Sequence, residues 1–308
     1  MTPDQAPEVD ILFCLEGTNR MNKKILITAE TGSDITKELA KELGIVLIPM
    51  HVSIGNKTLD DGAFPPEDVC AYYDRTGKVP TTSGSTPYDF ESVYDKIFAQ
   101  NPDAQILHLA YSAVTTCSYH SCELAIEGKH YAKNVRIVDT KHVSVGQCAV
   151  VVAVSAWLDA HPNATLDEAV ASAKKIGEET KMCFIPKNLD YLRAGGRVSN
   201  AVALVGNLLQ LHPCIEIIDG KLIAGKKYRG KLEKQAPVLL REFAAKHDLQ
   251  KDHIYFINTP YMDEPVRTAL DAEAAAMGFQ KITWVKTGCV ITCHGGPGAF
   301  GIVGMAGK

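Results

Sequence analysis

Hydroxyl side chains and one histidine are the groups in this chain best suited to hold a ligand. Residues 80–86 read PTTSGST and residues 111–118 read YSAVTTCS, and each run comes directly before a predicted helix. Hydroxyls and free amides at a helix N-terminus favour an anion, although a plain turn with a helix cap explains either run. His294 stands in TCHGGPGA (292–299), a glycine-rich sequence that predicts a low-bulk loop from which the imidazole could donate to an anion.

A basic side chain follows a pair of glycines further along the chain, in the sequence LRAGGRVS (192–199). Gly195 and Gly196 admit positive φ and a close backbone approach. We therefore expect Arg197 on a tight turn, where its guanidinium could make bidentate contact with a carboxylate or a phosphate. A glycine turn with a solvated arginine is the simpler reading of the same residues. A helix is predicted for 201–211, with His212 and Pro213 ending it.

Strands and helices alternate through the first half of the chain, which is typical of a parallel sheet. Apolar strands are predicted at 25–28, 45–48, 106–110 and 135–138, and helices at 36–43, 66–75, 88–100, 119–127 and 143–160. Unbroken apolar strands of this kind are covered by helices on both faces of their sheet. Ligands bind at the carboxyl ends of such strands, so this arrangement predicts a Rossmann-like α/β domain with a hydroxyl run, 111–118, at one strand end.

The second half predicts a different α/β domain with a mixed or antiparallel sheet. Asp219-Gly220 between apolar runs is a hairpin signal, and Thr165 with Glu168 forms a capping box at the start of a helix. Helices are expected at 232–247 and 264–277, and the last clear strand at 282–286. We divide the chain into an extension without function at 1–21, an N-terminal domain at 22–161 and a C-terminal domain at 162–308.

Composition narrows the class of protein. With 308 residues, 46% hydrophobic and 22% charged, the chain has material for two globular domains. The net charge of −4 argues against a nucleic-acid-binding protein. The nine cysteines show no CxxC spacing, which favours free thiols in a reducing cytoplasm over disulfides or zinc.

Residues 143–158, the longest apolar run, are too short and too polar to span a membrane, and no signal peptide is evident. The segment 221–234 contains six basic residues and only one acidic residue, which predicts a solvated face or a docking surface.

Several of these motifs together resemble the DegV family. YLRAGGRVSNA at 191–201, LLQLHP at 208–213 and DGKL at 219–222 look like its signature, and HGGPGA at 294–299 looks like its His-x-Gly-Pro-Gly-Ala motif. The resemblance implies a two-domain DegV-like fold that binds a long-chain fatty acid in an apolar tunnel between the domains. It also implies a cytoplasmic lipid-binding protein that is not itself an enzyme, needs no metal or cofactor, and presents the carboxylate to a separate fatty acid kinase. Transient membrane contact for lipid exchange would accompany such a role.

The resemblance also implies the site residues. Transferred residue by residue, the carboxylate-binding group consists of Thr82, Ser83, Ser112, His294 and Gly295, and the group that faces the kinase and its phosphoryl group consists of Arg197, Gly195 and Gly196.

Three places depart from the usual family sequence: Ala29-Glu30, Gly84-Ser85 and Ala113. The change at 113 replaces a serine, so Ser112 or Thr115 would have to supply the hydroxyl. The change at Gly84-Ser85 alters the stiffness of its loop, and the change at Ala29-Glu30 leaves open what position 30 does.

Two enzymatic functions are alternatives. A hydrolase or acyltransferase would use Cys293 or Cys117 as nucleophile and His294 as base, but adjacent residues such as Cys293 and His294 point in different directions and no third orienting group is evident. A nucleotide-binding enzyme would need a phosphate-binding glycine motif, and neither GxxxxGK[ST] nor GxGxxG after a strand occurs.

Overall fold

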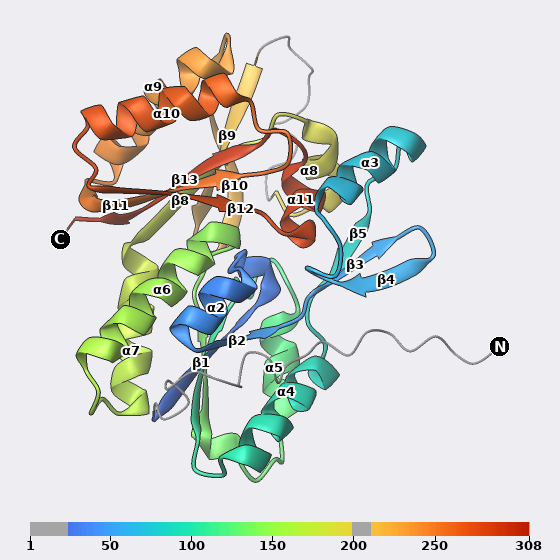
Figure 1. Cartoon of the computed structure of the whole chain (residues 1–308), viewed down its shortest axis with the longest axis vertical. Coiled ribbons are helices and arrows are strands. Elements are labelled where there is room, and N and C mark those ends of the chain that lie inside the picture. The colour runs from blue at the N-terminus through green and yellow to red at the C-terminus, as the bar shows by residue number, and fades with distance from the viewer. Residues whose placement is uncertain (1–23, 199–210, 308) are drawn as a thin grey trace.

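The computed structural model of this chain describes residues 24–198 and 211–307. A four-stranded parallel sheet and a six-stranded mixed sheet lie toward opposite ends of the long axis of the molecule, and a small three-stranded sheet projects to one side between them (Figure 1). The two-part α/β fold expected from the sequence is confirmed.

The parallel sheet has the strand order β2-β1-β6-β7. Its strands are β1 (Ile25–Glu30), β2 (Ile45–Ile48), β6 (Gln105–Ala110) and β7 (Val135–Asp139). Alternate side chains of β1 enter two different cores. Leu26 packs with α4 (Pro87–Gln100) and α5 (Ser118–Ile126). Ile25 and Ile27 pack with α2 (Lys37–Leu43), α6 (Ser144–Ala160) and α7 (Leu166–Glu179). Helices therefore cover both faces, as predicted.

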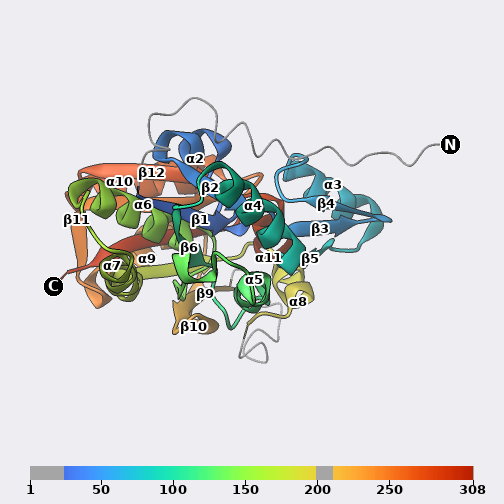
Figure 2. The same cartoon turned by 90° about the horizontal axis from the view of Figure 1, so that it is seen from below.

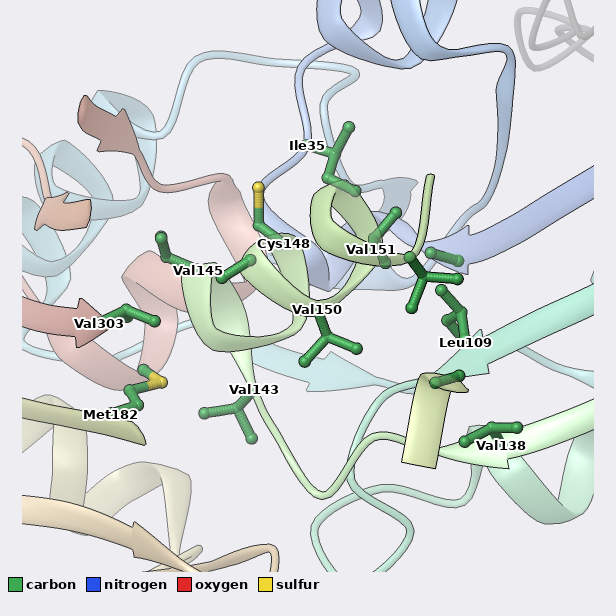
Figure 3. Close-up of a cluster of buried hydrophobic side chains, with 14 of the residues drawn as sticks. Ile35, Leu109, Val138, Val143, Val145, Cys148, Val150, Val151, Met182 and Val303 are labelled. Carbon is green, nitrogen blue, oxygen red and sulfur yellow. The ribbon is translucent and has the colours of Figure 1, made fainter. Parts of the chain in front are cut away.

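Helix α6 is the buried helix predicted at 143–160, and it contacts β1 and β6 of the parallel sheet as well as β8 (Thr180–Ile185), β11 (Leu249–Asn258) and β13 (Phe300–Ala306) of the mixed sheet. Figure 3 shows its side chains Val145, Cys148, Val150 and Val151 within this shared core. Helix α7 begins at the predicted Thr165–Glu168 capping box and also touches strands of both sheets. The predicted domain boundary at 161/162 falls between these two helices and stays a prediction.

The small sheet has the order β4-β3-β5 and carries α3 (Glu67–Thr76) beside it (Figure 2). β3 (His51–Ile54) and β4 (Lys57–Asp60) form an antiparallel hairpin around Gly55-Asn56. β5 (Thr81–Ser83) was not predicted. It pairs with β3 so that Thr82 lies opposite Val52, and a strand therefore fixes Thr82 where the sequence indicated a turn.

The six-stranded sheet has the order β10-β9-β8-β13-β11-β12. Its remaining strands are β9 (Leu211–Ile218), β10 (Lys221–Arg229) and β12 (Lys281–Lys286). Only the β11–β12 pair is parallel in this sheet as described. α9 (Leu232–Lys246) and α10 (Glu264–Ala276) cover one of its faces (Figure 1). The hairpin at Asp219-Gly220 is confirmed, with Ile218 opposite Lys221 and both turn residues at positive φ.

Two predictions for this half are wrong, and one strand was not predicted. His212 and Pro213 lie inside β9 and do not end a helix, and the rest of the predicted helix at 201–211 lies outside the described residues. The run at 292–299 is not a loop throughout, because α11 (Cys289–Gly295) includes His294. Strand β13 follows it and fills the sheet between β8 and β11. The glycines in β13 weaken its strand pattern, so the sequence did not predict it. Gly301 is needed there, because a Cβ would lie 2.8 Å from the carbonyl oxygen of Cys183.

Two short 3-10 helices, η1 (Thr31–Ser33) and η2 (Ala132–Asn134), and helix α8 (Leu189–Gly195) complete the described elements. Within the described ranges, no helix is both long enough and apolar enough to cross a membrane.

Candidate functional site

A largely apolar cavity lies where the N-terminal loops, α11 and the mixed sheet meet. Counted together with the open space at its mouth, it encloses about 810 Å³. Its apolar wall comes from both halves of the chain and consists of Met50, Tyr111, Val143, Met182, Phe184, Leu222, Ile257, Val290, Ile291 and Phe300.

Polar side chains that face this cavity differ in whether their hydrogen bonds are already used within the protein. Ser144 donates to Asp34, and Thr259 donates to the carbonyl of Ala299. Thr115 donates to the carbonyl of Ser112. Among the other polar side chains of the lining, Thr82 bonds to His294, and Arg197 bonds to the carbonyl of Gly195, which packs on His294. These groups therefore lie close to one another. The cavity therefore has one polar end, as expected for a ligand with a polar head and an apolar tail.

Thr82 and His294 are two of the five residues predicted to bind the carboxylate. They lie 212 positions apart in the chain and are joined by a hydrogen bond of 2.9 Å between Oγ1 and Nε2. Strand β5 positions the threonine and the last turn of α11 positions the imidazole. Burial, and secondly the nearby charge of Arg197, lower the pKa of His294 to about 4. The ring is therefore neutral near pH 7. If Nε2 carries the proton, it donates to Thr82 and leaves the threonine O–H free to donate to a ligand.

Arg197 also lines the cavity, and its Nη1 donates to the carbonyl of Gly195 at 2.6 Å. Gly195 packs against the Nδ1 edge of the His294 ring, because a Cβ built on it would lie 2.2 Å from Nδ1. Gly196 has a different role. It ends α8 in the left-handed conformation, with φ of 64°, and a Cβ there would meet open space. The glycine pair thus combines a close approach with a helix end, and together they place Arg197 beside the histidine.

Replacing these two glycines should have opposite effects. We expect Gly195→Ala to displace the imidazole, break the Thr82–His294 bond and weaken ligand binding about ten-fold with little change in stability, since alanine favours the helix. Gly196→Ala should instead lower the free energy of unfolding by about 1 kcal/mol, because of its positive φ, and leave binding unchanged. Binding titrations and thermal unfolding of both variants check this; equal binding by the two variants would contradict it.

Ser83, Gly84 and Gly295 also line the cavity. The departure at Gly84-Ser85 has a structural reason. A Cβ on Gly84 would come within 2.4 Å of Thr116 Oγ1, so glycine allows the two hydroxyl runs to pack together. Ser85 is buried and donates to the carbonyl of Pro49. The start of α4, as described, does not form the expected anion site. Thr86 and Asp89 form a capping box there, so their side chains already accept from the N–H groups at this helix end.

Ser112 does not line the cavity, contrary to the expectation that it helps bind the head group. Its side chain is buried, and Oγ donates to the carbonyl of Gly220 at 2.8 Å. The hydroxyl therefore ties the loop after β6 to the β9–β10 hairpin. Thr115 and Thr116, from the same loop, line the cavity in its place.

The departure at Glu30 also has a structural account. Its side chain is fully buried, and Oε2 accepts from Tyr111 N at 2.9 Å and from Gln147 Nε2 at 2.8 Å. Burial alone would raise the pKa of Glu30, but the adjacent His108 and these hydrogen bonds lower it overall. The carboxylate fixes the backbone at Tyr111, which is part of the cavity wall, and is not exposed to a ligand.

Two buried aspartates, which the sequence did not single out, hold the start of α11. Asp61 Oδ1 accepts from the backbone N–H of Cys289 and Val290, at 2.8 and 3.2 Å. Asp34 accepts from Gly288 N at 2.7 Å, and burial raises the pKa of Asp34 to about 8. Three successive N–H groups at this helix end therefore have carboxyl acceptors, which satisfies donors that the helix leaves free. These contacts tie the helix that carries His294 to the N-terminal half.

The geometry gives no support to a cysteine nucleophile paired with His294. Cys293 is 1% exposed, and burial raises the pKa of its thiol, which disfavours the reactive thiolate. His294 Nε2 bonds to Thr82. Cys117, which is exposed, precedes α5. In the part of the chain that the structure describes, no three His, Cys, Asp or Glu side chains are grouped to hold a metal ion.

The basic residues predicted as a face lie on β10 and the start of α9, and β10 is the edge strand of its sheet. Lys226 is paired with Glu242 at 2.7 Å. A backbone bridge between Val198 and Leu222 places the segment that carries Arg197 directly beside β10. Of the basic residues, Lys221 is the one next to this bridge.

Comparison with known proteins gives consistent results. Residues 24–306 match the model of the DegV family. A DegV family protein from Thermus thermophilus, whose structure is described as showing fatty acid binding, is 26% identical and superposes with a TM-score of 0.82 over 92% of this chain and 99% of that one. A fatty acid-binding protein from Thermotoga maritima is 29% identical over 90% of this chain and 96% of its own length. A DegV domain-containing protein from Deinococcus radiodurans is 27% identical over 90% and 97% of the two chains.

Proposed function

Because this chain belongs to the DegV family, we propose that it binds a long-chain fatty acid, with the tail in the apolar cavity and the carboxylate at the Thr82–His294 end. The observation that carries the proposal is the polarity of the cavity, whose wall is largely apolar and whose polar lining includes the hydrogen-bonded pair Thr82 and His294. The fatty acid binding described for the Thermus and Thermotoga relatives supports the same ligand class.

The tail supplies most of the affinity in this proposal. Each buried methylene contributes about 0.8 kcal/mol, so a long chain gains on the order of 10 kcal/mol before the losses of binding are counted. The head group is held by neutral donors, since the pKa of His294 is lowered to about 4. Neutral hydrogen bonds contribute about 1 kcal/mol each. The head group therefore sets orientation more than strength.

We expect Thr82→Ala and His294→Ala each to weaken fatty acid binding by about ten-fold or less, as the loss of one or two hydrogen bonds predicts. The double variant should bind about as weakly as His294→Ala alone, because the two side chains act as one unit. Calorimetric titration with a fatty acid and with the matching primary alcohol measures this. The alcohol should lose less than the acid; equal losses for both ligands would place the carboxylate elsewhere.

We propose further that the bound carboxylate is presented to a separate kinase for acyl-phosphate formation. Arg197 lies at the polar end of the cavity and beside the basic edge strand β10, where it could stabilise a phosphoryl group or an acidic partner surface. The protein itself then supplies binding and orientation, and the partner supplies ATP chemistry.

For this role we expect Arg197→Ala to keep fatty acid affinity within about three-fold, while acyl-phosphate formation with an added ATP-dependent fatty acid kinase falls at least about 100-fold. Arg193→Ala, on the exposed side of α8, is the matched control and should retain phosphate transfer. Unchanged transfer by Arg197→Ala would remove the arginine from this role, and a parallel loss of fatty acid binding would assign it to the head-group site.

A further inference from the structure

Met182 lies in the wall between two spaces of opposite character. It lines the apolar cavity, and it also lines a second, open pocket whose other walls include the charged side chains Lys181, Glu216 and Lys246. Its own side chain is only 3% exposed. An acyl chain that passed this residue would leave apolar surroundings and meet charged groups.

The strand places this side chain on the cavity side. Along β8, Met182 and Phe184 both line the cavity, while Cys183 and Ile185 pack into the core beneath α9 and α10. This alternation follows from the two-residue period of a strand. Figure 3 shows Met182 near Val143 and Val303, at the start of α6 and on the neighbouring strand β13.

A buried polar atom lies near Met182. A Cβ built on Gly146 would be 2.8 Å from Met182 Sδ and 3.0 Å from His142 Nδ1, so both atoms approach the same glycine of α6. The other nitrogen of His142, Nε2, bonds to the carbonyl of Gly177 at 3.0 Å and must therefore be the donor. Nδ1 is then an acceptor, and no partner for it is present among the described residues. A methylene placed against it gains little, because it covers a polar atom without bonding to it.

We propose that Met182 is the stop at the end of the acyl site: it sets the longest acyl chain for which every added carbon still increases the binding affinity. Below that length every added methylene is buried against apolar wall. At that length the tail reaches Met182, and beyond it lie His142 and the charged pocket. The inference rests on the proposed function, and it adds the residue that determines chain-length preference.

A series of saturated fatty acids from about ten to about twenty carbons tests the stop, with the dissociation constant measured for each on the intact protein. In the wild type, affinity should rise about four-fold per methylene up to a limiting length and then level off. Met182→Ala should move that limit up by about two to three carbons, since truncation opens the wall. Cys183→Ala, on the opposite face of the same strand, should keep the wild-type limit.

The outcomes separate this inference from the proposed function. A limit that stays the same in Met182→Ala and in the wild type overturns the stop, as does a wild-type affinity that rises without levelling off. If Met182→Ala does not fold, Met182→Val should give a smaller shift in the same direction, and no shift again overturns it. Failure of the wild type to bind any member of the series overturns the proposed function and this inference with it.

Discussion

Leu222→Trp should reduce the affinity for a long-chain fatty acid by about 100-fold. Leu222 lines the cavity from β10 and is 7% exposed. An indole in its place would fill space that the tail needs, and displacing three or four methylenes at about 0.8 kcal/mol each accounts for a loss of this size. The edge position of β10 makes the larger side chain easier to accommodate than it would be in a central strand. Titration with a fatty acid of fixed length measures the effect.

Ile223→Trp is the matched control for that experiment. Ile223 is the next residue of β10 and points to the other face of the strand, away from the cavity. Its substitution should leave affinity within about three-fold of the wild type. If both tryptophan variants lose binding equally, the effect comes from disturbance of the β9–β10 hairpin and not from blockage of the cavity.

Asp61→Ala should lower the free energy of unfolding by about 2 to 4 kcal/mol and should also weaken ligand binding. The substitution leaves the N–H groups of Cys289 and Val290 buried without an acceptor, and each unsatisfied donor costs about 1 to 3 kcal/mol. Because α11 carries His294 at its other end, loosening its start also moves the head-group site. Denaturant unfolding and a fatty acid titration measure the two effects.

Asp61→Asn separates the hydrogen bonds from the charge. The amide oxygen can still accept from both N–H groups, and burial already raises the pKa of Asp61, which disfavours its charged form. We therefore expect the asparagine variant to recover most of the stability and binding lost in the alanine variant. Equal losses in both would show that the negative charge, and not the acceptor, holds α11.

Local sequence pattern was sufficient for most of the framework. Apolar strands in the first half, the capping box at Thr165 and the Asp219-Gly220 hairpin are all present where expected, because each depends on residues close together in the chain. Strand β13 was missed because Gly301 and Gly304 weaken its strand pattern. A Cβ on Gly301 would meet the backbone of Cys183, and one on Gly304 would crowd the Leu249 side chain, and only the folded sheet supplies these neighbours.

Long-range contacts decide the parts of the site that sequence could not give. Family resemblance placed Thr82 and His294 in one group of five residues, and the structure joins these two directly. The hydroxyl of Ser112 was an equally good candidate for binding the carboxylate, but it donates to the carbonyl of Gly220 in the hairpin. Asp34 and Asp61 looked like ordinary loop acids, and their role depends on backbone N–H groups more than 220 positions away.

Mass spectrometry of a solvent extract from the denatured protein, as purified, tests the central claim most directly. The account predicts one fatty acid per chain, with a hydrocarbon tail, and loss of that lipid from Leu222→Trp but not from Ile223→Trp. An empty extract that stays empty after incubation with fatty acids of several lengths would contradict fatty acid binding.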